Sequence, residues 1–190
     1  MKDFFYQLFN LKTKKSTVEI GKVLFEDCLY NTKTILDDNN KIETLGISNV
    51  NRNYLYQELC IIYMYTVVYH FRGVLNNKKL EFEILDMMRL AYYNFLRNVL
   101  NFDDKMTEEA HHYLIHRFTQ YEEFSKKSGR LESSDDLFKL VKKMLDNLSR
   151  GQSSDLVSIM SLTALTMSDP TIYPFFQNIV SKHNIYSVNQ

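Results

Sequence analysis

The chain has 190 residues, enough for one domain with a substantial core, and its 45% hydrophobic and 24% charged residues are ordinary for a globular protein. Its 23 Lys and Arg balance 23 Asp and Glu, and no segment concentrates basic residues, which argues against a nucleic-acid-binding protein. Cys28 and Cys60 belong to no CxxC pair, so we expect reduced, buried thiols and a cytoplasmic location. The longest nearly apolar run, residues 59–69, is too short for a transmembrane segment, and the first residues lack the apolar stretch of a signal peptide.

Helix-breaking residues are scarce along the whole chain, which holds five Gly and two Pro. No Asn-Gly or Asp-Gly hairpin signal occurs, and apolar residues recur at helical spacing between the breaks. The pattern predicts helices over residues 3–11, 16–37, 51–72, 79–101, 107–128, 133–149, 154–168 and 172–183. We therefore expect an all-α protein, a single domain over residues 1–190 in which seven or eight helices pack around a buried central helix, residues 51–72.

The first fifteen residues combine large apolar side chains with a basic end. Phe4, Phe5, Leu8 and Phe9 crowd a short predicted helix, and three lysines follow it by residue 15. Folded back onto the domain, such a segment would cap the core. Left free, it would be a docking helix for a protein partner or a membrane surface. These four side chains are therefore candidate partner-binding residues.

The predicted helix over residues 51–72 is apolar on nearly every face, which is typical of a helix buried in the middle of a domain. Glu58 is an ionisable exception in its first turns. We expect the helix N-terminus to stabilise this carboxylate, or an arginine such as Arg89 or Arg97 to pair with it. The alternative is an acid with a shifted pKa in a functional pocket.

Three of the five histidines fall within the predicted helix over residues 107–128, which Thr107 is expected to cap. Glu109, His112 and His116 follow one another at i, i+3 and i+7, so they share a helix face and their spacing suits three ligands of a divalent transition metal. This face lies opposite the apolar stripe of the same helix, so we favour a solvated polar surface and keep the metal site as the alternative. The stripe comprises Ala110, Tyr113, Leu114, Phe118, Tyr121 and Phe124.

The predicted helices at the C-terminal end begin with capping patterns. Ser133 and Ser153 each precede acidic residues that the helix dipole favours in a first turn. The helix over residues 154–168 is apolar nearly all round and carries small polar residues such as Ser158 and Thr166. These permit another helix to approach closely, either in the core or at a dimer interface.

The motifs of several common enzyme classes are missing from the sequence, including glycine-rich phosphate loops, GxSxG and HExxH. We therefore expect a non-catalytic all-α interaction or regulatory protein without a cofactor, such as a small inhibitor, antidote or adaptor of bacterial or mobile-element origin. Such a protein would bind a protein partner or form a homo-oligomer. The alternative is a metal-dependent helical-bundle enzyme that uses Glu109, His112 and His116.

Overall fold

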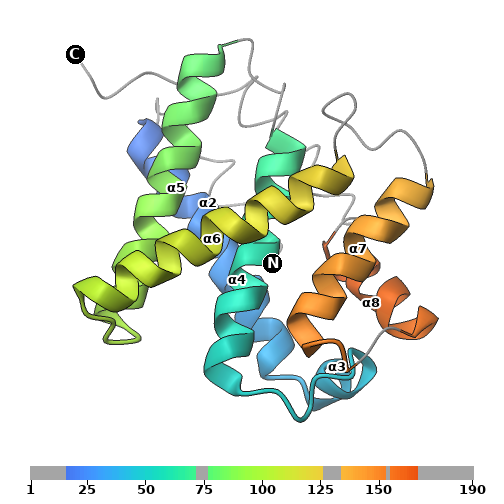
Figure 1. Cartoon of the computed structure of the whole chain (residues 1–190). Helices are drawn as coiled ribbons and strands as arrows, with labels where there is room; N and C mark the ends of the chain where they lie inside the picture. The colour runs from blue at the N-terminus through green and yellow to red at the C-terminus, as the bar shows by residue number, and fades with distance from the viewer. Residues whose placement is uncertain (1–15, 72–76, 126–133, 153–154, 167–190) are drawn as a thin grey trace, which may run out of the picture.

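The computed structural model describes residues 16–71, 77–125, 134–152 and 155–166. Over these ranges the chain forms seven helices and no strand, which confirms the all-α prediction (Figure 1). The helices predicted over residues 3–11 and 172–183 lie outside the described residues. The observed helices are α2 (Thr17–Leu36), α3 (Asn39–Thr44), α4 (Arg52–Phe71), α5 (Lys78–Asn98), α6 (Asp104–Ser125), α7 (Ser134–Ser149) and α8 (Leu156–Thr166).

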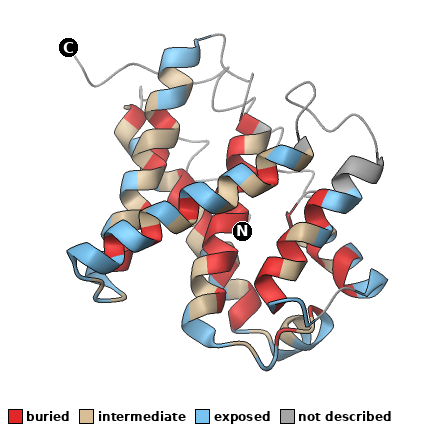
Figure 2. Ribbon diagram, in the orientation of Figure 1, coloured by how far each residue is buried: buried red, intermediate tan, exposed pale blue. Residues whose placement is uncertain are grey.

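The central position of α4 is also confirmed. Its backbone approaches α2, α6, α7 and α8, and Figure 2 shows buried residues along its length. A helix surrounded in this way needs apolar residues on all sides, which explains why its sequence shows almost no amphipathic pattern. Its fully or almost fully buried side chains include Leu59, Cys60, Ile61, Ile62, Met64, Tyr65 and Phe71.

Helix α2 packs closely against both α4 and α5. Gly21 makes the contact with α5 possible, because a Cβ added at this position would lie 2.5 Å from the Cβ of Met87 and 2.7 Å from the carbonyl oxygen of Ile84. One turn further on, the ring of Phe25 packs edge-on against Tyr92, with centroids 6.0 Å apart. The two helices therefore run in the same direction, and the first turns of α2 lie beside the N-terminal half of α5.

Two helix starts differ from the prediction by more than one residue. Helix α6 begins three residues earlier than expected, because Asp103 rather than Thr107 serves as its cap and accepts a hydrogen bond from the backbone N–H of Met106 at 2.7 Å. Thr107 instead lies buried within the first turn, and its hydroxyl donates to the carbonyl of Asp103 at 2.7 Å. Helix α8 begins after Asp155, whose carboxylate accepts the N–H of Ser158 at 2.7 Å.

Helix α3 was not predicted. Its six residues are too few to show a hydrophobic period, and none of them is fully buried. A local signal was nevertheless present, because the carboxylate of Asp38 caps the helix by accepting the N–H groups of Asn40 and Lys41 at 3.0 and 3.3 Å.

The small side chain of Ser158 lets α8 pack closely against the end of α3. Its hydroxyl donates to the carbonyl of Thr44 at 2.8 Å, and the residue is buried. The contact lets another helix of the same chain approach closely, with Ser158 buried and the end of α3 at the surface. No helix within the described ranges is both long enough and apolar enough to cross a lipid bilayer.

Candidate functional site

The predicted metal ligands lie on the outer face of α6. Glu109, His112 and His116 are all exposed, as the helical pattern predicted. Glu109 lies 4.0 Å from the ammonium group of Lys105, and the Nε2 atom of His116 lies 3.0 Å from the side-chain nitrogen of Gln120. Among the described residues, no three His, Cys, Asp or Glu side chains gather where they could hold a metal ion. The metal site therefore stays a prediction from spacing alone.

The buried carboxylate of Glu58 pairs with Arg117. The expected partners Arg89 and Arg97 are wrong: Arg89 pairs with Asp86 on its own helix, and Arg97 reaches the carboxylate of Asp104 at 2.9 Å. The Nε atom of Arg117 lies 2.8 Å from Oε1 of Glu58. This ion pair is almost completely shielded from solvent, since the side chain of Glu58 is 0% exposed and that of Arg117 is 13% exposed.

Polar groups from α6 and α7 complete a cluster around this ion pair. The hydroxyl of Tyr113 donates to the same carboxylate oxygen of Glu58, and Arg117 also donates to the hydroxyl of Tyr113 at 2.7 Å. On the other side, the hydroxyl of Tyr54 donates to the carbonyl of Asn147 at 2.6 Å. We call Tyr54, Glu58, Tyr113, Arg117 and Asn147 the Glu58 cluster. Its contacts connect α4, α6 and α7.

The environment of Glu58 indicates a role in holding helices together. Burial raises the pKa of its carboxyl group, and the charge and hydrogen bond of Arg117 work in the opposite direction. Its second oxygen, Oε2, is buried and has no hydrogen-bond partner among the described residues. A side chain with no exposed atom offers nothing to a substrate in this conformation, so the functional-pocket alternative gains no support from the geometry.

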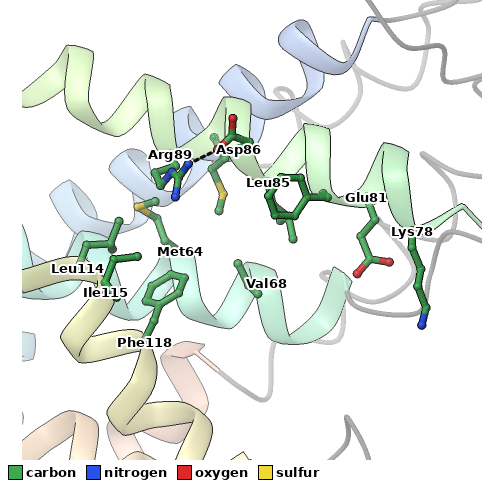
Figure 3. Close-up of a pocket in the computed structure, with 12 residues that line it drawn as sticks. Met64, Val68, Lys78, Glu81, Leu85, Asp86, Arg89, Leu114, Ile115 and Phe118 are labelled. Carbon is green, nitrogen blue, oxygen red and sulfur yellow. Dashed lines mark hydrogen bonds and ion pairs between the residues drawn. The ribbon is translucent and has the colours of Figure 1, made fainter. Parts of the chain in front are cut away.

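An open groove lies between α4, α5 and α6, and its volume is about 520 Å³. Its apolar side chains come from all three helices, and Figure 3 shows them facing a common space. Charged groups stand along the α5 side, where Asp86 and Arg89 form an ion pair with each other. The lining residues are Met64, Val68, Lys78, Glu81, Phe82, Leu85, Asp86, Met88, Arg89, Leu114, Ile115 and Phe118.

The groove opens because α5 and α6 diverge from the turn that joins them (Figure 1). Close to this turn, the hydroxyl of Tyr93 on α5 lies 2.5 Å from Nδ1 of His111 on α6, with the rings edge to face. Beyond this contact the helices separate, and side chains of α4 such as Met64 and Val68 line the space between them. The groove is thus a consequence of helix geometry.

Two large apolar side chains at the groove are exposed to solvent. Phe82 on α5 is 69% exposed, and Ile115 on α6 is 43% exposed. Exposed aromatic and aliphatic groups around a hollow are typical of a surface that binds another apolar group. Eight of the twelve residues that line the groove are apolar, which suits the binding of apolar side chains.

This groove was not predicted from the sequence, because its residues come from three separate helices. The candidate partner-binding residues Phe4, Phe5, Leu8 and Phe9 lie outside the described residues. A signal was present in Phe82, a large apolar residue that lies between the acidic residues Glu81 and Glu83.

Comparison with known proteins gives no further guide to this site. Neither a family model nor a curated protein nor a solved structure matches the chain.

Proposed function

We propose that this chain is a non-catalytic, regulatory protein that binds a protein partner through the groove between α4, α5 and α6. The observation that carries the proposal is the exposure of Phe82 and Ile115 beside an apolar hollow. An exposed Phe has a free-energy cost in water that burial against a partner would remove.

The shape of the groove favours a helical ligand. Its walls are two diverging helices, and an amphipathic helix laid between them would place residues i, i+4 and i+7 against the apolar lining. Met64 and Met88 are flexible side chains that adapt to different ligand shapes. The charged groups of Lys78 and Glu81 on the α5 side suit a polar margin around such an interface.

Site-specific photocrosslinking in cells, followed by reconstitution, tests this function. A photoreactive residue at position 82 should capture a discrete protein that the same residue at position 138 does not capture. Phe138 is a suitable control because it is 44% exposed on α7 and does not line the groove.

The captured protein is then purified and its affinity measured by calorimetry. We expect Phe82→Lys and Ile115→Lys each to weaken binding at least tenfold, whereas Phe138→Lys leaves the affinity unchanged. Circular dichroism checks that all three variants fold. Folded groove variants that bind as tightly as the parent protein would refute the proposal.

A further inference from the structure

We propose that residues 4–11 of the same chain bind in the groove between α4, α5 and α6 and compete there with the protein partner. This inference rests on the proposed function, because it assigns a second ligand to the same groove. Residues 1–15 lie outside the described residues; their sequence and the positions of α2 and α5 support the proposal.

The sequence of this segment has the pattern that the groove requires. Phe4, Leu8 and Leu11 follow one another at i, i+4 and i+7, the spacing of an amphipathic helix that presents one apolar face. Asn10 falls away from that face. A helix of this length supplies two or three large apolar groups, which suits a groove of about 520 Å³.

The chain between α2 and residues 4–11 is long enough for these residues to reach the groove. Gly21 contacts α5 at Ile84, Met87 and Met88, and Met88 also lines the groove. The start of α2 is therefore separated from the groove by the width of α5, about 10 Å. The residues between Leu11 and Ser16 span roughly 16 Å when extended, about half the circumference of that helix, so the segment reaches the groove with this connection extended.

A tethered ligand also has an advantage over a free one. A short connection raises the effective concentration of the segment at the groove to the order of millimolar, far above the concentration of a second copy of this chain in a dilute solution. Binding within one chain is therefore favoured over exchange between two chains. A protein partner would have to displace the segment, so its apparent affinity would depend on residues 4–11.

Disulfide trapping in the full chain tests the contact. Leu8→Cys is combined with Phe82→Cys, and the rate of intramolecular disulfide formation is followed by mass spectrometry in a glutathione buffer. The matched control combines Asn10→Cys with Phe82→Cys. Position 10 is nearer to the tether but lies on the other face of the predicted helix, so random motion alone would favour the control.

We expect the Leu8 pair to form at least ten times faster than the Asn10 pair, as a monomer. A pair of Leu8→Cys and Tyr30→Cys should also be slow, since Tyr30 is half-exposed on α2 and lies away from the groove, about 21 Å along the helix from Ser16. Equal rates at the three pairs would overturn the proposal. A disulfide that forms only between two chains would overturn it too, and would make a second copy the occupant.

A peptide experiment gives an independent measurement. A labelled peptide of residues 1–15 should bind the full-length Phe4→Asp/Leu8→Asp variant, whose groove is vacated, at least ten times more tightly than it binds the parent protein. Adding Phe82→Lys to that variant should abolish the binding. A peptide that binds neither protein overturns the inference.

The two proposals fail in different ways. If only the inference is wrong, the partner still loses affinity on Phe82→Lys while the Leu8 disulfide stays slow. If only the partner proposal is wrong, the Leu8 disulfide forms rapidly and no partner is captured at position 82.

Discussion

Arg117 on α6 donates a hydrogen bond at 2.8 Å to the carboxylate of Glu58 on α4, across 59 positions of the sequence. The ion pair is buried, and Tyr113 donates to the same carboxylate oxygen. Because α6 also forms one wall of the groove through Leu114, Ile115 and Phe118, the contact that fixes α6 on α4 also fixes that wall. The stability of the domain and the shape of its surface are therefore linked at Glu58.

Replacing Arg117 with Ala should strongly destabilise the protein. The change leaves the Glu58 carboxylate buried without a counter-ion, and the free energy of unfolding should fall by about 3–5 kcal/mol in urea denaturation at neutral pH. Arg52→Ala is the control, since Arg52 also pairs with an aspartate at 2.8 Å but both side chains are more than half exposed. Its loss should stay below about 1 kcal/mol. Similar losses for the two variants would contradict the assigned role.

The cost of Arg117→Ala should shrink as the pH falls. Burial raises the pKa of Glu58 while Arg117 opposes the rise, so removing Arg117 leaves the upward shift unopposed. A raised pKa in the folded state means that the folded protein binds the proton more tightly than the unfolded chain. The variant therefore gains stability as the pH falls through the raised pKa, down to the unfolded value near 4.5.

Urea denaturation of both proteins from pH 8 to pH 4 measures this difference in stability. The gap between parent and Arg117→Ala should narrow toward pH 4. If the difference in the free energy of unfolding between the two proteins widened on acidification, removing Arg117 would have lowered the folded-state pKa of Glu58, contrary to this prediction.

Gly21→Ala should destabilise the contact between α2 and α5. Alanine favours a helix over glycine by about 1 kcal/mol, but its Cβ would meet backbone atoms of α5 that cannot turn aside. We expect overpacking to outweigh the gain, with a net loss of about 1–2 kcal/mol in thermal or urea denaturation. The neighbouring Lys22→Ala is exposed on the same helix and should change stability little. A Gly21→Ala protein more stable than the parent would show that the helices can separate without cost.

The two thiols should be unreactive in the folded protein. Burial raises the pKa of Cys60 to about 12, against a smaller opposing effect from Thr32, and burial also raises the pKa of Cys28. Only the thiolate attacks an alkylating reagent, so both cysteines should resist iodoacetamide at pH 8 and react fully in urea. Mass spectrometry counts the modified thiols. Rapid labelling of the folded protein would mean that the core around α2 and α4 opens readily.

The helices could be predicted from the sequence because local periodicity encodes them. The apolar stripe on α6 is an example: Ala110, Leu114 and Tyr121 are buried, as predicted, while His112 lies exposed on the opposite face. The free, buried state of both cysteines was also predicted correctly. The stripe on α6 depends only on neighbours within a few turns of one helix.

The partners between helices could not be predicted in the same way. Glu58 was expected to pair with Arg89 or Arg97, and this expectation was wrong. The reason is that a sequence does not reveal which turns of two helices meet in space. Arg117 could have been considered, since it follows Tyr113 by four residues and borders the apolar stripe of its helix. The groove was harder still to predict, because it depends on the angle between α5 and α6.

The contact between Tyr93 and His111 has a mechanical consequence for that angle. Phe82 lies eleven residues before Tyr93 on α5, about 16 Å away along the helix axis. If α5 rotates by roughly 5° about this contact, Phe82 moves by about 1.4 Å. Substitutions at Tyr93 or His111 that change the angle between α5 and α6 would therefore change the width of the groove near Phe82, although neither residue lines the groove.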